Sequence, residues 1–346
     1  MQYILHITKN CNFDCNYCYQ EKSNDFMSKD IAIKIADFAL EDALKKNKKS
    51  ADISFYGGEP LLCKDLIFSV VAHCKEISKN TNVIFGYKMT TNGWYLDENF
   101  INFAVENNFD IALSIDGIKE VHDKHRLTSD REKTFERILE AAKLLLDKLP
   151  KSSAMMTINP DTDLYLFDSI VFLNKIGFNT IITTPNFQGQ WKNFNVLKEE
   201  YVKTADWYSQ KLINGDDIKL PLFDNKLISN VTDIVQKNKC VPTKYRMSID
   251  TDGSIYPCIQ YVHFKDYKYG EVLKNIMFNN KKMDEIVKEY NIENCNGCAL
   301  NDRCDNNCGC KNLSLTGNAK FVSPIVCEHE RMLIPVADYL GGLIFE

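Results

Sequence analysis

The sequence predicts an α/β fold, a partial, open parallel barrel followed by a cysteine-rich region. Three observations support this prediction. Short β-rich runs alternate with longer helical patterns through residues 1–215, as in parallel sheets and barrels. There are six such strand–helix units, fewer than a complete barrel contains. After residue 240 the pattern changes, and Asn, Asp, Gly and Cys dominate 291–313, so this region is expected to rely on metal for folding.

The predicted strands and helices alternate in chain order. The strands are short runs rich in β-branched and aromatic residues at 3–8, 52–55, 82–89, 110–115, 154–158 and 180–184. The helices are longer amphipathic runs at 28–44, 64–78, 97–106, 134–149, 164–175 and 197–213.

The sequence suggests three successive parts. Residues 1–215 form the partial barrel, and 216–239 form a bridge that contains a short amphipathic run. Residues 240–346 form the cysteine-rich domain, with short strands at 247–249 and 254–256 and a C-terminal helix.

Composition limits the classes of protein to which the chain can belong. Of its 346 residues, 45% are hydrophobic and 26% are charged, and the net charge is -5. This charge provides no global attraction to nucleic acid, so we expect no nucleic-acid partner. No signal peptide and no apolar stretch long enough to cross a membrane is evident. We therefore expect a cytoplasmic protein without a membrane partner.

Thirteen cysteines in such a protein require an explanation. A reducing compartment and an odd count argue against a disulfide framework. Cys63 and Cys74 lie in an apolar helical run and are expected to be core residues. The others fall in two groups, at 11–18 and 240–327, and such grouping indicates metal binding.

The first group has the spacing C-x3-C-x2-C, formed by Cys11, Cys15 and Cys18 in the loop after the first strand. Three thiolates this close can bind three corners of an iron–sulfur cubane and leave one iron open. Structural zinc is the alternative, but it requires a fourth ligand that is not evident nearby. His6 is close in sequence, yet it lies within the predicted strand and is expected to be buried there.

Two further motifs sharpen this prediction. An aromatic residue, Tyr17, precedes the last cysteine, and Gly57-Gly58-Glu59-Pro60 follows the second strand. Together with the cysteine spacing, these motifs resemble the radical S-adenosylmethionine (SAM) superfamily. The resemblance implies that the open iron chelates SAM, whose cleavage yields a 5′-deoxyadenosyl radical. It also implies that the GGEP-like motif binds the methionine amino group, whereas the alternative for this motif is a tight strand-to-helix turn.

Polar residues also follow the fourth strand, where ligands bind in barrel folds. The resemblance assigns Ser114 and Asp116 to the ribose of SAM and Arg126 to its carboxylate, which a guanidinium can bind in a bidentate manner. Alternatively, Asp116 is a turn residue, and His122 and Asp123 are solvated residues at a helix start. Residues 91–93 are a weaker candidate for lining the same site.

Seven of the eight cysteines in the second group occur in an order that resembles the full SPASM motif of peptide-modifying radical SAM enzymes. The resemblance implies two auxiliary clusters, and thus three [4Fe-4S] clusters in total. The first auxiliary cluster would be held by Cys240, Cys258 and Cys308. The second would be held by four cysteines: Cys295, Cys298, Cys304 and Cys327. A zinc knuckle is the alternative for the C-x2-C pair at 295 and 298.

One departure from the family pattern concerns the first auxiliary cluster. Some relatives carry a further cysteine shortly after the position of Cys240, and residues 241–247 contain none. The cluster is then expected to have an open iron that binds a substrate thiolate, unless the spare Cys310 completes it.

The resemblance implies an enzyme that modifies a peptide or protein side chain and receives electrons from a reductant such as flavodoxin or ferredoxin. Our first hypothesis is a maturase that forms a thioether or other crosslink in a ribosomally made peptide. The alternative is an anaerobic sulfatase-maturating enzyme that oxidises Cys or Ser to formylglycine. Those enzymes place a carboxylate directly after the equivalent of Cys258, whereas this chain has Ile259 and Gln260. A third hypothesis is a zinc-rich interaction module without catalysis. Because the chain begins at the first strand, we expect substrate recognition at the barrel mouth or by a separate protein.

Overall fold

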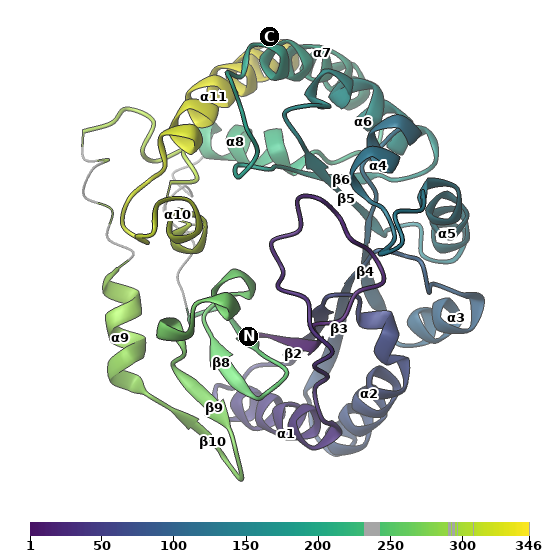
Figure 1. Ribbon diagram of the computed structural model, residues 1–346, viewed down its shortest axis with the longest axis vertical. Helices are drawn as coiled ribbons and strands as arrows, with labels where there is room; N and C mark the ends of the chain where they lie inside the picture. The colour runs from purple at the N-terminus through teal and green to yellow at the C-terminus, as the bar shows by residue number, and fades with distance from the viewer. Residues whose placement is uncertain (232–242, 290–291, 293–294, 296, 307, 346) are drawn as a thin grey trace. The chain divides into compact units, whose positions relative to one another are not determined.

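The computed structural model describes residues 1–231, 243–289, 292, 295, 297–306 and 308–345 (Figure 1). The chain divides into two compact units. The first comprises Met1–Asp14, Cys18–Ala112 and Val241–Lys288. The second comprises Cys15–Tyr17, Leu113–Cys240 and Glu289–Glu346.

The first unit is built on a mixed sheet with strand order β10-β9-β8-β7-β1-β2-β3. Its parallel part consists of β1 (Gln2–Thr8), β2 (Ser50–Gly57), β3 (Ile84–Thr91) and β7 (Arg246–Ile249). The antiparallel extension consists of β8 (Ser254–Tyr256), β9 (Gly270–Val272) and β10 (Ile276–Phe278). Its helices are α1 (Lys29–Lys45), α2 (Lys64–Ser78), α3 (Glu98–Glu106) and α9 (Asn280–Lys288).

Strand β1 is hydrogen-bonded along both edges, to β2 on one side and to β7 on the other. Leu5 stands opposite Phe55 of β2 and Ile249 of β7, and all three side chains are fully buried. Six of the seven β1 residues are buried, as expected for a parallel strand covered on both faces. The end of this strand therefore gives the following cysteine loop a rigid starting point.

The helices of the first unit begin where side chains cap free N–H groups. The Ser28 hydroxyl accepts a hydrogen bond from the Ile31 N–H at 3.3 Å and starts α1. The Asp97 carboxylate accepts one from the Phe100 N–H at 2.8 Å and starts α3.

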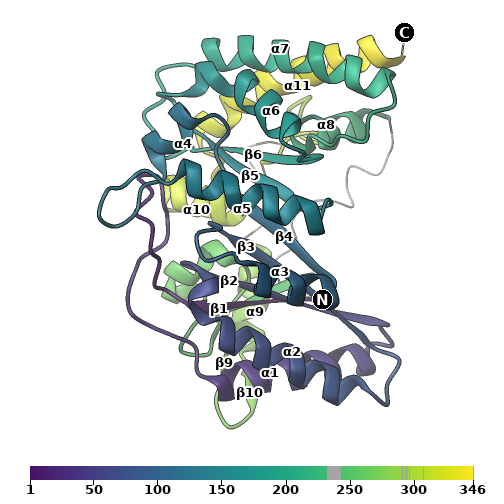
Figure 2. The same cartoon turned by 90° about the vertical axis from the view of Figure 1, so that its right-hand side faces the viewer.

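The second unit contains the end of β4 (Phe109–Ser114) and a parallel pair of strands, β5 (Ser153–Ile158) and β6 (Thr180–Pro185). Its helices are α4 (Lys119–His125), α5 (Phe135–Lys148), α6 (Leu166–Lys175), α7 (Asn195–Ile213), α8 (Pro221–Val231), α10 (Gly309–Thr316) and α11 (Pro324–Phe345). Helix α11 runs beside α7 in both views (Figures 1 and 2), and the Tyr201 hydroxyl lies 3.0 Å from His329 Nε2 between them.

All six predicted strand–helix units form in the order expected from the sequence, and so do the two short strands near 250 and the C-terminal helix. The prediction missed α4, α9, β9 and β10, which are short. It also missed α10, which forms within the polar segment around 310 because Cys310, Asn312 and Leu313 provide a buried face. The division at 215 and 240 stays a prediction, and the compact units group β7–β10 with β1.

None of the helices in the described part of the chain combines the length and the apolar character that crossing a lipid bilayer requires.

The turn after β4 supplies a test of this packing. Gly117 has φ +92°, and a Cβ atom there would lie 2.1 Å from the Ser169 Cβ of α6. Gly215 has a similar φ of +78° but no atom within 4 Å of its Cβ position. Gly117→Ala should therefore destabilise the protein by about 2 kcal/mol more than Gly215→Ala, because it adds a steric clash to the same backbone strain. Urea denaturation of both variants measures this difference, and equal losses would contradict the packing.

Candidate functional site

The GGEP-like motif in the first unit is bonded to the start of the cysteine loop. The Gly58 N–H donates to the Thr8 carbonyl and the Glu59 N–H donates to the Asn10 carbonyl, both at 2.9 Å. A Cβ atom on Gly57 would lie 2.1 Å from the Thr8 oxygen, and one on Gly58 would lie 2.1 Å from the Asn10 oxygen. Both glycines are therefore required for this close backbone approach, whatever ligand binds nearby.

Glu59 is completely buried and holds this turn in place. Its carboxylate accepts hydrogen bonds from the Leu61 N–H at 3.0 Å, the Thr91 hydroxyl at 2.7 Å and the Asn92 N–H at 2.7 Å. Burial raises the pKa of Glu59 to about 7, although these three donors oppose the shift. The motif thus forms the strand-to-helix turn that we considered as an alternative, and its role toward SAM stays a prediction.

Asn92 anchors the first part of the cysteine loop. Its amide nitrogen lies 2.9 Å from Asn12 Oδ1 and 3.8 Å from the Cys11 sulfur. The buried Phe13 ring packs edge-on against Trp94, with ring centres 5.7 Å apart. The weaker candidate segment at 91–93 therefore lies directly against the loop that carries Cys11.

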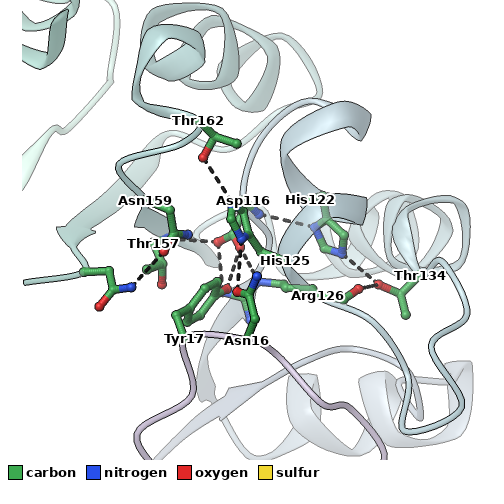
Figure 3. Close-up of polar contacts among 11 residues, drawn as sticks. Asn16, Tyr17, Asp116, His122, His125, Arg126, Thr134, Thr157, Asn159 and Thr162 are labelled. Atoms are coloured by element: carbon green, nitrogen blue, oxygen red, sulfur yellow. Dashed lines mark hydrogen bonds and ion pairs between the residues drawn. The ribbon is translucent and has the colours of Figure 1, made fainter. Parts of the chain in front are cut away.

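In the second unit, the half-buried Tyr17 contacts the buried Asp116 and Arg126 (Figure 3). Arg126 donates to Asp116 in a bidentate manner, with Nε at 2.9 Å from Oδ2 and Nη2 at 3.0 Å from Oδ1. The Tyr17 hydroxyl and the Thr157 N–H donate to the same carboxylate, at 2.5 Å and 2.9 Å. The guanidinium also lies over the Tyr17 ring, 5.4 Å from its centre.

The ion pair keeps both partners charged despite burial. Burial favours a neutral Asp116, but the guanidinium of Arg126 outweighs it and lowers the pKa of this carboxyl. Burial likewise opposes the charge on Arg126, and Asp116 outweighs it, so the pKa of Arg126 is raised. Asp116 is therefore more than a turn residue, because four donors converge on it.

His122 is hydrogen-bonded to the backbone of Asp116 and to the side chain of Thr134, and so orients this ion pair. It is fully buried, and burial lowers its pKa to about 3, so the ring is neutral at neutral pH. Its Nδ1 accepts from the Asp116 N–H at 3.3 Å, and its Nε2 lies 3.0 Å from the Thr134 hydroxyl, which donates to the Arg126 carbonyl at 2.6 Å. The alternative that His122 is solvated is wrong. Asp123 instead accepts from the first N–H groups of α5 and caps that helix.

His125 holds the middle of the cysteine loop, a contact that the sequence did not reveal. Its carbonyl accepts from the Asn16 N–H at 3.2 Å, and its Nδ1 lies 3.0 Å from Asn16 Oδ1. Its Nε2 lies 3.2 Å from the Thr162 hydroxyl. Ser114, by contrast, is half-buried as the last residue of β4. Within the loop, Cys15 is half-buried and Cys18 is exposed.

Four cysteines of the second group line one cavity of about 230 Å³ in the second unit, and we refer to it as the four-cysteine pocket. The other lining residues are Leu300, Asn301, Asn306, Val322, Pro324, Glu330 and Arg331. The cysteines are those that the SPASM resemblance grouped: Cys295, Cys298, Cys304 and Cys327. Burial raises the pKa of Cys304 to about 12.

The residues expected at the first auxiliary cluster are described only in part. Cys240 lies outside the described residues. In the first unit, the buried Cys258 follows β8 and precedes a short helix, Ile259–His263. In the second unit, the Cys308 sulfur lies 3.3 Å from that of Cys310, and this contact lowers the pKa of Cys308 to about 6 against the effect of burial.

Near Cys258 the first unit contains two tyrosines and two histidines, of which the sequence analysis considered only His6. The hydroxyls of Tyr19 and Tyr56 lie 2.7 Å apart. His263 packs against Tyr19 and the buried His6 against Tyr56, with ring centres 5.9 Å and 5.3 Å apart. The sequence offers one signal for the two tyrosines, which is that each adjoins a motif. Tyr19 follows Cys18, and Tyr56 precedes Gly57.

Comparison with known families identifies the class. The model of the radical SAM superfamily matches residues 5–173, and that of the SPASM iron–sulfur cluster-binding domain matches residues 240–299. The chain belongs to the radical SAM superfamily and carries a SPASM domain. It is therefore an enzyme of a class that uses iron–sulfur clusters and SAM. The two family models also confirm the predicted fold class, a radical SAM barrel followed by a SPASM domain.

Two relatives and one solved structure are similar to this chain over most of its length. The cysteine-type anaerobic sulfatase-maturating enzyme of Clostridium novyi (strain NT) is 25% identical over 85% of this chain and 84% of its own length. The radical SAM cyclopropyl synthase TigE of Paramaledivibacter caminithermalis is 22% identical over 95% of this chain and 72% of its own. A structure of native anSMEcpe with bound AdoMet and Cp18Cys peptide superposes with a TM-score of 0.81 at 20% identity, covering 99% of this chain and 98% of that chain.

The buried ion pair yields a prediction about stability. Asp116→Asn should destabilise the protein by about 3 kcal/mol, because Arg126 then keeps an uncompensated charge in a buried site. Glu136→Gln breaks an exposed pair with Lys119 and should leave stability unchanged. Since the folded-state pKa of Asp116 is lowered, its contribution is present above the unfolded-state pKa of about 4 and is lost as the pH falls through the folded-state value. Urea denaturation at neutral and acid pH measures this, and a difference between wild type and Asp116→Asn that does not shrink in acid would contradict it.

Proposed function

We propose that this enzyme oxidises a cysteine or serine side chain of a protein substrate to formylglycine, as an anaerobic sulfatase-maturating enzyme. The observation that carries the proposal is the alignment with the cysteine-type enzyme of Clostridium novyi, which extends over most of both chains. Neither chain leaves a large part unmatched, so the similarity includes both the barrel and the cysteine-rich region. This assignment favours our sequence-based alternative over the peptide crosslinker.

The cluster ligands are proposed from the two motifs. Cys11, Cys15 and Cys18 would hold the first cluster and leave one iron for SAM. Cys240, Cys258 and Cys308 would hold the first auxiliary cluster, and the four-cysteine pocket would hold the second. The pocket supports this last assignment, because all four cysteines line one cavity. No three Cys, His, Asp or Glu side chains in the described ranges converge on a single-ion site, as structural zinc would require.

Bound SAM would supply the 5′-deoxyadenosyl radical that abstracts hydrogen from the substrate. For its binding we propose seven residues, taken from the motifs that resemble the family: Tyr17, Gly57, Gly58, Glu59, Ser114, Asp116 and Arg126. Within the first unit, the two glycines and Glu59 hold the turn against the start of the cysteine loop. Arg126 donates to Asp116 through Nε and Nη2, so a bound carboxylate would be held by the remaining N–H groups of the guanidinium.

A second candidate function is crosslinking of a ribosomally made peptide, for example through a thioether. One observation favours it: Ile259 and Gln260 follow Cys258, and neither side chain can accept a proton from a substrate thiol. Either function takes a peptide or protein substrate and a reductant such as flavodoxin or ferredoxin, and we place the enzyme in the cytoplasm.

Metal content tests the cluster assignments. Anaerobically reconstituted protein should bind about twelve iron and twelve sulfide per chain, the content of three four-iron clusters. Replacing Cys295 by Ala should lower the iron content by about a third, because this site loses a ligand. Cys63→Ala is the matched control and should lose none, since Cys63 lies outside both motifs. Stoichiometric zinc with little iron would refute the cluster assignments and support the interaction-module hypothesis.

Substrate specificity tests the reaction. With SAM and a reductant, the enzyme should convert a sulfatase-derived peptide containing the target cysteine to an aldehyde, which a hydrazide probe captures for mass spectrometry. The same peptide with alanine at the target position should not react. Ile259→Asp should increase the rate about tenfold or more, because a carboxylate after Cys258 supplies the missing base. A thioether product without aldehyde would favour the crosslinking function instead.

A further inference from the structure

One wall of the four-cysteine pocket carries a buried ion pair that the proposed reaction does not use. Lys226 of α8 is 2% exposed and Glu330 of α11 is 3% exposed. The Lys226 Nζ lies 2.7 Å from Glu330 Oε2. Glu330 lines the pocket together with the four cysteines, and it follows Cys327 by three residues, so both side chains are on the same face of α11.

The same pair holds the backbone on both sides of Cys304. Lys226 Nζ donates to the Arg303 carbonyl at 3.1 Å and pairs with the Asp305 carboxylate at 3.1 Å. The Asp305 N–H donates to Glu330 Oε2 at 3.1 Å. Cys304 is thus the residue between two neighbours that this ion pair fixes, and it lines the pocket.

Outside the pocket, Arg303 reinforces this arrangement. Its Nη2 donates to the Lys226 carbonyl at 3.3 Å, and its guanidinium binds Asp338 of α11 in a bidentate manner at 2.6 and 3.0 Å. Helices α8 and α11 are therefore linked to the Cys304 segment by charged groups rather than by apolar packing alone.

A buried ion pair is costly where packing is the only requirement, because apolar residues of similar volume are often as stable or more so. Both charges persist here at neutral pH. Burial opposes the charge on each group, but Glu330 and Asp305 raise the pKa of Lys226, and His329 and Lys226 lower that of Glu330 to about 2. A charged pair beside the four-cysteine pocket interacts electrostatically with any negative charge inside that pocket.

We propose that the Lys226–Glu330 ion pair positions Cys304 and balances the charge of the second auxiliary cluster, so that it sets the reduction potential of that cluster. This inference rests on the proposal that the four cysteines hold an iron–sulfur cluster. Reduction adds a negative charge, which the Lys226 ammonium stabilises and the Glu330 carboxylate disfavours. Lys226 and Glu330 are positioning residues, since the ligands are the cysteines.

The test is a redox titration followed by electron paramagnetic resonance on the reconstituted full-length protein. The signal of the second auxiliary cluster is assigned in a full-length background in which the described cysteines of the other two sites are replaced by alanine: Cys11, Cys15, Cys18, Cys258 and Cys308. Iron content is measured on every variant.

Lys226→Met should lower the midpoint potential, with about a tenfold change in the reduction equilibrium, which corresponds to ~59 mV for one electron. Glu330→Gln should shift the potential in the opposite direction, and the double variant should lie between the two. Lys226→Arg keeps the charge and should stay close to wild type. The control Lys211→Met removes a lysine paired with Asp216, which does not line the pocket, and should have no effect.

Opposite shifts are the result that a merely structural role would not produce. Potentials that stay constant, or that move in the same direction in both single variants, would overturn the inference while leaving the cluster assignment intact. If Lys226→Met fails to bind the cluster, an unshifted Glu330→Gln variant would also overturn it. If the background protein with Lys226 and Glu330 unchanged binds no iron, both the inference and the cluster assignment on which it rests are refuted.

Discussion

The double pairing of β1 is the constraint on which the first unit depends. Because β1 is bonded to β2 on one edge and to β7 on the other, segments more than 200 residues apart in the chain share one sheet. The cysteine loop leaves the end of β1, the GGEP-like turn leaves the end of β2, and Cys258 follows β8, which pairs with β7. The β7–β10 part of the cysteine-rich region therefore extends the sheet of the first unit rather than folding as an independent zinc module would.

A buried ion pair lies beside each of two cysteine-bearing segments, the cysteine loop and the four-cysteine pocket. Asp116 and Arg126 are buried together near the middle of the cysteine loop, and Lys226 and Glu330 are buried together at the four-cysteine pocket. Each pair loses solvation, and each recovers part of this cost through additional hydrogen bonds to the backbone. Such bonds make the pairs directional, so they hold the loops that carry cysteines in one geometry.

Much of the candidate site was predictable because its residues are neighbours in sequence. Cys11, Cys15 and Cys18 lie within eight residues, and the GGEP-like turn directly follows a strand with a clear pattern. The sequence did not predict the roles of three further residues near Asp116: His122, His125 and Thr134. A histidine on a short helix has the same local sequence whether it is solvated or buried, and only the packing around Asp116 decided that His122 is neutral and bonded.

The sequence by itself determined the alternation of strands and helices, the two cysteine groups and the family, since each depends on local periodicity or on spacing along the chain. Only the tertiary structure decided that Gly57 and Gly58 make room for the backbone of the cysteine loop and that Lys226 reaches Glu330 across 104 residues. It also brought β7 to the edge of β1. Contacts between distant segments depend on how the elements pack, and side-chain periodicity specifies which face is buried but not which partner covers it.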